Sequence, residues 1–517
     1  MIEYLDLLMF AAAILVLLLG FPVAFSLAGV AIIFALLGDY FGVFPIQFLK
    51  AIPQRIFGTM TNEVLMAVPL FIFMGTILEK SKVAEDLLEN MSKLFRHIRG
   101  GLGISVTLVG ALLAASTGIV GATVVTMGLL SLPTMLKNGY DTKLATGVIT
   151  AAGTLGQIIP PSIVLILLGD VISNAYQQSQ LEMGIFSPDT VSVGDLFAGS
   201  LIPGLLLVSL YILYQFFKAF FDPESTPEIK IIDNNINYIL LLKALFPPLT
   251  LIIAVLGSIL SGFATPTEAA SVGAIGSILL ASNRIAKDNF YSFIATFSFI
   301  LLLALNLVFD LRLNRDNLNF YEISFLFLAL IIFSIFFVSS LISIYKLFLS
   351  GVLFDAARSS TKITSMVFII LIGATFFSLV FRGLGGDETI EHFLTNLPGG
   401  TFSAILIVMI AMFLLGFFLD FIEITFVVVP IVAPIILQMG IDPVWLGVMM
   451  AINLQTSFLT PPFGFALFYL RGVAPNTVKT SQIYRGVVPF ILIQMIMLIL
   501  LSAFPIIATW LPTYIFN

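Results

Sequence analysis

Residues 149–170 read ITAAGTLGQIIPPSIVLILLGD, and residues 453–465 read NLQTSFLTPPFGF. Both stretches are apolar, and in both a double proline follows amide and hydroxyl side chains. A proline inside a helix removes an amide donor and frees the carbonyl group four residues earlier, which in the first stretch means Gly156 and Gln157. One double proline is compatible with a simple kink. Two of them, each preceded by polar side chains, predict a pair of broken helices whose loops bind an ion or a substrate.

The two double prolines belong to an internal repeat. Looser matches align Gly75 with Gly373 and Pro22 with Pro266, and the second copy carries an insertion that we place at residues 283–349. Prolines and glycines are frequent in membrane helices, but five matches in one order at one offset favour a true repeat. The five recur after a constant displacement of 301 positions: Pro133, Gly139, Asp141, Pro160 and Pro161 reappear as Pro434, Gly440, Asp442, Pro461 and Pro462.

The composition places these stretches in a membrane. Of the 517 residues, 59% are hydrophobic and 10% are charged, and the mean hydropathy is +1.11, whereas a soluble domain usually has about 25% charged residues. One soluble core cannot hide so much apolar surface, because such cores stop growing near roughly 300 residues. The chain has no cysteine, and its two histidines, His97 and His392, lie in polar connecting segments, which argues against disulfides, zinc sites and catalytic triads. It also has no GxxxxGK[ST] phosphate loop, which argues against an ATPase.

Apolar runs of the length needed to cross a bilayer, about 20 residues, predict twelve membrane spans. The first begins at the N-terminus, MIEYLDLL, because a signal peptide would start with basic rather than acidic residues. Two longer runs, 104–136 and 401–437, have polar centres at Ser116–Gly118 and at Asp420 and Glu423. Each predicts a re-entrant hairpin, since non-helical backbone at membrane depth is tolerated only inside protein or beside a water-filled cavity. We place the spans near residues 4–20, 22–38, 62–78, 143–172, 196–217, 239–260, 263–281, 290–309, 322–348, 363–381, 444–470 and 486–513.

The placement of lysine and arginine gives the orientation. With both termini outside, most of the 23 lysine and arginine residues fall on inner loops, as the positive-inside rule requires. The helices at 143–172 and 444–470 then run in opposite directions, so the repeat is inverted. We therefore expect an all-α polytopic membrane protein with two inverted repeats, residues 1–217 and 239–517, joined by a cytoplasmic linker at 218–238. This organisation indicates a secondary transporter whose site lies near the midplane of the bilayer.

The centre of the first predicted hairpin offers ligands for a cation. A helix broken at Ser116, Thr117 and Gly118 exposes carbonyl oxygens, which together with two hydroxyls suit Na+, and exposes amides that suit a carboxylate. The alternative is that these hydroxyls bond back to the preceding turn or hold helices together. At the neighbouring break, Thr154 and Gln157 add polar side chains.

The break in the second half has a similar set of polar residues. Asn453, Gln455, Thr456 and Thr460 stand just before its prolines. If the two loops are equivalent, Gln157 and Gln455 are counterparts, and we expect their loss to have the same effect.

Charged side chains at membrane depth need a reason, because each unpaired one costs roughly 3 kcal/mol or more. Asp420 and Glu423 lie at the centre of the second predicted hairpin, and we favour a functional role for Asp420. Glu268 lies in ATPTEAASVG, where the alternative is a helix-start carboxylate. Arg382 ends a predicted span and either clamps an anion or extends its head group to the membrane surface. The segment from Glu79 to Gly100 is amphipathic and is expected to lie on the inner surface as a coupling arm.

Several motifs resemble those of the large membrane subunit of tripartite ATP-independent periplasmic (TRAP) transporters. In chain order they are GFPVAF, AVPLFIFMG, AASTGIVGAT, GTLGQIIPPS, GSLIPG, ATPTEAASVGA, FLDFIEI and TPPFGFALFYLRG, and they cover nearly the whole chain. The resemblance implies an elevator-type fold like that of the ion-transporter superfamily, in the bacterial inner membrane. It implies a Na+-driven importer of organic acid anions that works with a four-helix small membrane subunit and a periplasmic substrate-binding protein. We expect no enzymatic activity and no nucleic-acid partner.

Transferred onto the matching positions, the resemblance implies two sodium sites, each between a hairpin and a broken helix. One would use Ser116–Gly118 with the loop Gly153–Pro160, and the other would use Asp420–Ile424 with Asn453–Pro461. The residues expected around Na+ are Ser116, Thr117, Gly118, Gly153, Gly156, Pro160, Asp420, Glu423, Ile424, Asn453, Thr456 and Thr460. Those expected around the substrate are Ser116, Thr117, Thr154, Gln157, Ser162, Ser173, Glu268, Arg382, Gln455 and Thr456.

Two other functions stay open at this point. A stand-alone divalent-anion/Na+ symporter would share the inverted repeat and the broken helices but would need no binding protein. An intramembrane enzyme would need a nucleophile or a metal site, and the chain has no cysteine and no histidine within a predicted span. The added spans at 283–349 depart from the shorter members of the family and serve either as extra scaffold or as a contact for the small subunit.

Overall fold

The computed structural model describes residues 4–95, 97–228, 238–285, 290–309, 311 and 320–516. Within these ranges the chain is helical and contains no strand. Parts of the predicted linker at 218–238 and of the predicted insertion at 283–349 lie outside the described residues. The predicted all-α class is confirmed for the part of the chain that is described.

The helices fall into two runs, one before and one after the predicted linker. The first run is α1 (Leu5–Leu18), α2 (Val23–Tyr40), α3 (Ile52–Met60), α4 (Ala67–Lys80), α5 (Val83–Leu94), α6 (Gly101–Thr117), α7 (Val120–Lys137), α8 (Thr142–Thr154), α9 (Ile163–Glu182) and α10 (Val193–Phe221). The second run begins with α11 (Tyr238–Leu260), α12 (Pro266–Ile285), α13 (Phe290–Val308), α14 (Phe320–Leu349), α15 (Val352–Gly383) and α16 (Gly386–Thr395). It continues with α17 (Gly400–Leu415), α18 (Phe421–Val427), α19 (Val429–Gln438), α20 (Pro443–Leu459), α21 (Phe465–Val473), α22 (Thr480–Ala503) and α23 (Ile506–Phe516).

Six of the described helices are long and apolar enough to cross a membrane by themselves, and two bent helix pairs are apolar enough to form further spans. Their outward faces carry many large apolar side chains, and only 22% of the apolar window of α14 is buried within the protein. Such surfaces are compatible with lipid and not with water. The chain is therefore a multi-pass membrane protein.

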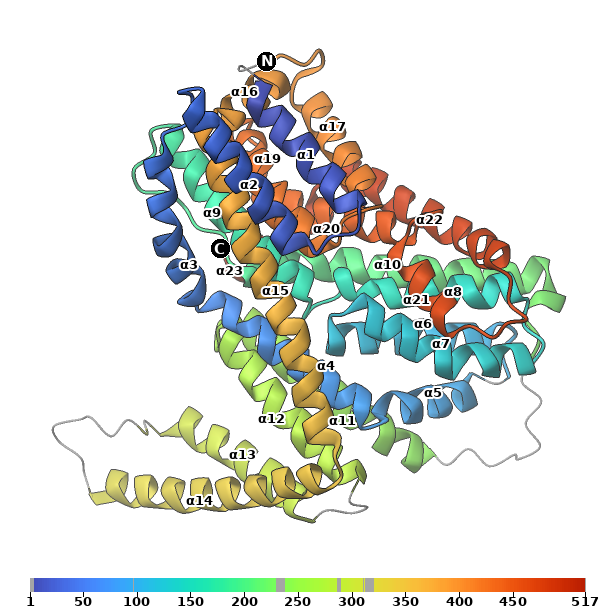
Figure 1. The fold of residues 1–517 in the computed structure, drawn as a ribbon. Coiled ribbons are helices and arrows are strands. Elements are labelled where there is room, and N and C mark those ends of the chain that lie inside the picture. The colour runs from blue at the N-terminus through green and yellow to red at the C-terminus, as the bar shows by residue number, and fades with distance from the viewer. Residues whose placement is uncertain are drawn as a thin grey trace.

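The longest described helix, α15, connects distant parts of the structure. It has 32 residues, which at 1.5 Å per residue corresponds to about 48 Å, well beyond the hydrocarbon thickness of about 30 Å. It packs along α2 and α4 over much of its length (Figure 1). At one end of the molecule α13 and α14 lie side by side and contact α12, apart from most of the other helices (Figure 1).

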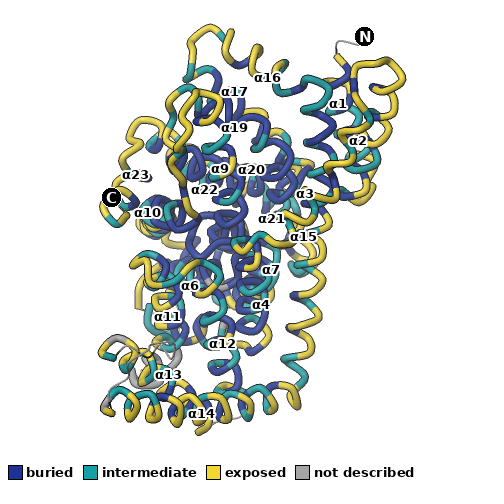
Figure 2. The backbone as a smooth tube through the Cα atoms, turned by 90° about the vertical axis from the view of Figure 1, so that its left-hand side faces the viewer, coloured by how far each residue is buried: buried dark blue, intermediate teal, exposed yellow. Residues whose placement is uncertain are grey.

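The buried residues concentrate in the middle of the molecule, around α9 and α20 (Figure 2). All 17 residues of α20 are buried, and so are all residues of α8 from Leu144 to Thr154. These two helices are the ones that lead into the double prolines. The breaks are therefore held in the protein core, away from lipid.

The structure differs from the predicted spans in three places, each at a proline or a bend. The predicted span 486–513 is two helices, α22 and α23, with Pro505 between them. The predicted span 62–78 is the second arm of a pair, Ile46–Met60 with Val64–Lys80, that is bent by 57°. The second arm of the hairpin at 401–437 is bent by 56° between α18 and α19, and Pro430 follows this bend in the first turn of α19. A proline has no amide hydrogen to donate, so it favours such interruptions.

Candidate functional site

The first double proline breaks its helix as predicted. After Thr154 the chain tightens into a short 3-10 helix, Leu155–Gln157, and α9 begins only at Ile163. Ser162 spans the gap, because its Oγ donates to the Gln157 carbonyl oxygen over 3.0 Å. The Pro160–Pro161 peptide bond is cis. Thr154, Gln157 and Ser162 are all fully buried.

The second double proline has the same effect. Helix α20 ends at Leu459 and α21 begins at Phe465, and the Gly464 amide closes the loop by donating to the Thr460 carbonyl oxygen over 3.0 Å. The Pro461–Pro462 bond is also cis. Just before the break, the hydroxyls of Thr456 and Thr460 each donate to the carbonyl oxygen four residues earlier.

The two broken helices meet through one side-chain hydrogen bond. Gln455 Nε2 of α20 donates to Thr154 Oγ1 of α8 over 3.2 Å, and the two residues are 301 positions apart. This separation equals the displacement that relates the repeated prolines. The bond therefore joins equivalent positions of the two halves, and the expected pairing of Gln157 with Gln455 is wrong by three residues. At the shared offset, Gln157 corresponds to Phe458.

Buried polar atoms at the breaks lack partners. Neither amide atom of Gln157 has a hydrogen-bond partner among the described residues, and neither does Gln455 Oε1. Both side chains are fully buried. A buried polar atom left without a hydrogen bond costs about 1–3 kcal/mol, so these amides are candidates to bind water, a cation or a substrate.

The tip of the first hairpin, formed by α6 and α7, lies against the first break. Gly118 ends α6 in the left-handed region, at φ +59°, and a Cβ atom placed on it would lie 3.2 Å from the Ile163 amide nitrogen. A Cβ atom on Gly156 would lie 3.5 Å from Ala114 in α6. Thr117 Oγ1 is 2.8 Å from Thr123 Oγ1 across the turn and donates to the Leu113 carbonyl oxygen. This hydroxyl thus makes the back-bond that was the alternative to a ligand role.

The other residues of this predicted site fit the same packing. A Cβ atom on Gly153 would come within 2.3 Å of Val124 in α7, so the hairpin covers the loop from Gly153 to Pro160 closely. The backbone of Ser116 lies in the last turn of α6, and its side chain is outside the described part of the structure. The proposed ligands Ser116–Gly118 and Gly153–Pro160 are therefore neighbours in space.

The second hairpin, formed by α17, α18 and α19, lies against the second break. A Cβ atom on Gly416 would lie 2.2 Å from Ser457 Oγ in α20. Asn453 Nδ2 donates to the Met409 carbonyl oxygen of α17 over 2.8 Å, which ties α20 to this hairpin. Fully buried Ile424 lies in α18. Asp420–Ile424 and Asn453–Pro461 thus belong to adjoining elements.

Asp420 and Glu423 form the start of α18. Asp420 Oδ1 accepts from the Phe421 amide over 2.7 Å, and Glu423 Oε2 accepts from the Asp420 amide over 2.7 Å. Together they make a capping box. Glu423 Oε1 takes no part in this box, so ligand capacity remains at the hairpin tip.

Three predicted substrate residues lie elsewhere. Glu268 is exposed and caps α12, where its Oε2 accepts from the Thr265 amide over 2.8 Å. Ser173 is partly buried in α9, about three turns beyond the break. Arg382 donates to the Gln178 side chain over 3.2 Å and to the Pro430 carbonyl oxygen over 3.0 Å, and it forms an ion pair with Asp387 at 3.2 Å.

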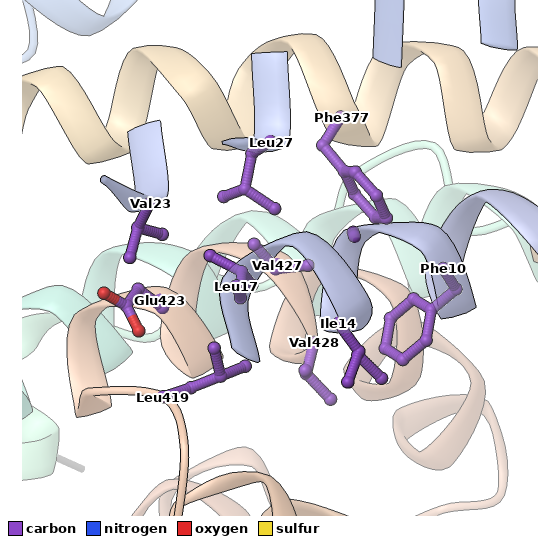
Figure 3. A pocket seen from close by; sticks show the side chains of 11 residues that line it. Phe10, Ile14, Leu17, Val23, Leu27, Phe377, Leu419, Glu423, Val427 and Val428 are labelled. Carbon is purple, nitrogen blue, oxygen red and sulfur yellow. The ribbon is translucent and has the colours of Figure 1, made fainter. Parts of the chain in front are cut away.

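A cavity separates each hairpin from the helices beside it. The one at the first hairpin has a volume of about 170 Å³ and is partly polar. The one at the second hairpin is smaller, about 20 Å³, and apolar except for Glu423, which Figure 3 shows among Val23, Leu17 and Leu419. The larger cavity is lined by Gly75, Thr76, Glu79, Lys80, Thr117, Ile119, Ala122, Ser359 and Ile363.

The polar wall of the larger cavity was missed in the sequence. Glu79 and Lys80 end α4, 3.7 Å apart, and the sequence pattern assigns them to a surface segment. Thr76 and Ser360 join α4 to α15 by a hydrogen bond of 3.4 Å. Among the described residues no group of three or more His, Cys, Asp and Glu could hold a metal ion. The oxygens that the breaks do offer are carbonyl, hydroxyl and amide oxygens.

One protein family and several of its characterised members match this chain over nearly its whole length. The profile of the family described as "Tripartite ATP-independent periplasmic transporter, DctM component" matches residues 10–507. The C4-dicarboxylate TRAP transporter large permease protein DctM of Vibrio cholerae is 28% identical over 516 residues, which cover 98% of this chain and 97% of that protein. The ectoine/5-hydroxyectoine large permease protein UehC of Ruegeria pomeroyi is 27% identical, covering 98% and 99%.

Two further similarities concern substrate diversity and fold. The sialic acid TRAP transporter large permease protein SiaM of Vibrio cholerae is 26% identical, covering 95% of both chains. Among solved structures, the YdaH transporter of Alcanivorax borkumensis superposes with a TM-score of 0.53 at 15% identity, covering 89% of this chain and 88% of that one. At that identity the likeness concerns the fold alone.

Proposed function

Since this chain belongs to the DctM family of TRAP transporter large permease subunits, we propose that it imports an organic acid anion together with Na+. In this proposal a periplasmic binding protein delivers the anion and a small membrane subunit completes the transporter. The relatives named above act on C4-dicarboxylates, ectoines and sialic acid. Membership of the family makes the chain an integral membrane transport subunit and not an enzyme.

The observation that carries the proposal is the contact of each hairpin tip with a broken helix. Gly118 adjoins Ile163 at the first break, and Gly416 adjoins Ser457 at the second. At each of the two breaks, the core therefore contains freed carbonyl groups, hydroxyl groups and the start of a half-helix. Transporters use this arrangement to bind Na+ and anionic groups. We assign one cation to each place.

Charge balance explains why cations should accompany the cargo. A carboxylate placed alone in a low-dielectric core loses its hydration, at a cost of several kcal/mol. Two cations held in the neighbouring loops offset that cost. The unpartnered amide of Gln157 and the unpartnered Oε1 of Gln455 add uncharged hydrogen-bonding groups near the two breaks.

The larger cavity supports a route for the anion past the first hairpin. Thr117 lines it from the hairpin, and Lys80 lines it from α4. Its volume of about 170 Å³ is well above the roughly 10–15 Å³ that one water needs, so it can admit a carboxylate group with water. In an elevator movement the hairpin would slide along α4 and α15 at this cavity.

The test is uptake by the complete transporter in proteoliposomes. The chain is reconstituted with the small subunit and supplied with a periplasmic binding protein, and radiolabelled succinate, sialic acid and ectoine are offered in turn. We expect one of them to accumulate under an inward Na+ gradient and none under a K+ gradient. Accumulation that does not depend on Na+ would refute the coupling, and accumulation without the binding protein would indicate a stand-alone symporter.

A further inference from the structure

A single buried bond connects the two cation positions proposed above. Gln455 and Thr154 are both fully buried, and each belongs to the turn that leads into its own break. Thr154 is the last residue of α8, and Gln455 precedes the end of α20 by one turn. The 3-10 helix after Thr154 also contacts α20.

The donors and acceptors of this bond are fixed by its surroundings. The Thr154 hydroxyl donates to the Ala151 carbonyl oxygen over 2.9 Å, so toward Gln455 it acts as an acceptor. The Gln455 amide nitrogen supplies the hydrogen. Its Oε1 then has no hydrogen-bond partner among the described residues. A reorientation of the Gln455 amide therefore changes both its bond to the last residue of α8 and the direction of its unpartnered oxygen.

We propose that the Thr154–Gln455 hydrogen bond couples the two sodium sites, so that a cation bound at one break improves the geometry of the other. This inference rests on the proposed function and adds a positioning role for two residues that contact each other across the repeat. The physical element is the bond itself, which ties the carbonyl-bearing turn Ala151–Thr154 to the turn Asn453–Thr456. Coupling between sites of this kind changes affinities by about 5- to 150-fold.

The same chain provides a matched control. Gln215 Nε2 of α10 donates to Thr107 Oγ1 of α6 over 2.7 Å, and Gln215 Oε1 likewise has no partner among the described residues. This bond has the same chemistry and the same burial, but neither residue lies in a turn that leads into a double proline. If the Gln455–Thr154 bond has only a structural role, its loss should affect stability and Na+ binding in the same way as loss of the Gln215–Thr107 bond.

The experiment measures equilibrium binding of 22Na+ to the full-length chain, purified in detergent together with its small subunit, against a constant background of K+. The variants are Gln455→Leu, Thr154→Val, Thr154→Ser and the control Gln215→Leu, and thermal unfolding is recorded for each. For the wild type we expect a Hill coefficient well above 1. Gln455→Leu and Thr154→Val should bring it to about 1 and raise the half-saturating Na+ concentration at least about fivefold.

The remaining variants separate coupling from folding. Thr154→Ser keeps the hydroxyl and should keep the cooperativity, and Gln215→Leu should lower the unfolding temperature without changing the Hill coefficient. If Gln455→Leu does not fold, Thr154→Val decides, because at nearly constant shape it removes the hydroxyl that accepts from Gln455 and donates to the Ala151 carbonyl oxygen. A wild type that binds no Na+ would overturn the proposed function itself. This inference alone would be overturned if Na+ binding had the same Hill coefficient and the same half-saturating concentration in the wild type, Gln455→Leu and Thr154→Val.

Discussion

Replacing Asp420 by asparagine distinguishes two roles of its carboxylate, as the cap of α18 and as a negative charge beside a cation. Asn and Asp are about equally good at the N-cap, so Asp420→Asn can still accept from the Phe421 amide, as Asp420 Oδ1 does over 2.7 Å. Glu423→Gln likewise keeps the capping box, because glutamine also serves at its third position. Both variants therefore retain the start of α18 while each removes one negative charge.

The two consequences differ in size. A retained cap should keep the free energy of unfolding within about 0.5 kcal/mol of the wild type, whereas Asp420→Ala loses the cap and about 1 kcal/mol. A carboxylate about 4 Å from a cation contributes about 4 kcal/mol at an effective dielectric constant near 20, part of which is offset by desolvation. If 1.4–2.8 kcal/mol of it is realised, the half-saturating Na+ concentration rises about 10- to 100-fold.

The assay is Na+-dependent uptake in proteoliposomes, with thermal unfolding measured on the same preparations. We expect Asp420→Asn to shift the Na+ dependence strongly and the unfolding temperature hardly at all. Glu423→Gln should have a smaller effect on Na+, because Glu423 borders the apolar cavity beside α1 and α2. An unchanged Na+ response in Asp420→Asn would show that this carboxylate is only a helix cap.

Three other perturbations test the Arg382–Asp387 ion pair, the packing of Gly416 and the larger cavity. Burial raises the pKa of Asp387 and the Arg382 charge opposes that rise, so the folded state holds this proton more readily than the unfolded chain. Arg382→Gln should therefore raise the pKa of Asp387 further and make the unfolding temperature fall more steeply from pH 4 to pH 8. Asp387→Asn should remove that extra pH dependence. Gly416→Ala places a Cβ atom 2.2 Å from Ser457 Oγ and should cost about 1–3 kcal/mol in the free energy of unfolding, partly restored by Ser457→Gly; no loss of stability would contradict the close packing. Lys80→Gln should slow anion uptake severalfold at unchanged Na+ affinity, while Lys137→Gln, at the far end of α7, should not; equal rates in both would exclude the cavity as a route.

The sequence was informative where a residue type limits the backbone. Pro160–Pro161 and Pro461–Pro462 broke their helices as predicted, because a proline cannot donate to the preceding turn. Gly118 ends α6 in the left-handed conformation, which glycine adopts without steric cost. The constant offset of 301 residues also contained the Thr154–Gln455 pair, but the expected pairing followed residue type, amide with amide, instead of the offset.

Long-range packing could not be predicted in the same way. The polar cavity depends on how Glu79 and Lys80 at the end of α4 face Thr117 of the hairpin and Ser359 of α15, and no local pattern specifies that contact. Arg382 had two interpretations from the sequence, and its partners, Gln178 and the Pro430 carbonyl, come from separate helices. Pro505 lies inside the apolar run that predicts one span at 486–513, although it separates α22 from α23.

Locating the bound monovalent cations directly would test whether each break holds a sodium site. Crystals of the complete transporter grown with Tl+ in place of Na+ give an anomalous signal at each bound ion. We expect one peak beside Gly118 and the loop after Thr154, and a second beside Asp420 and the loop after Leu459. Peaks at neither break, in crystals of a transporter that still responds to Na+, would contradict this expectation.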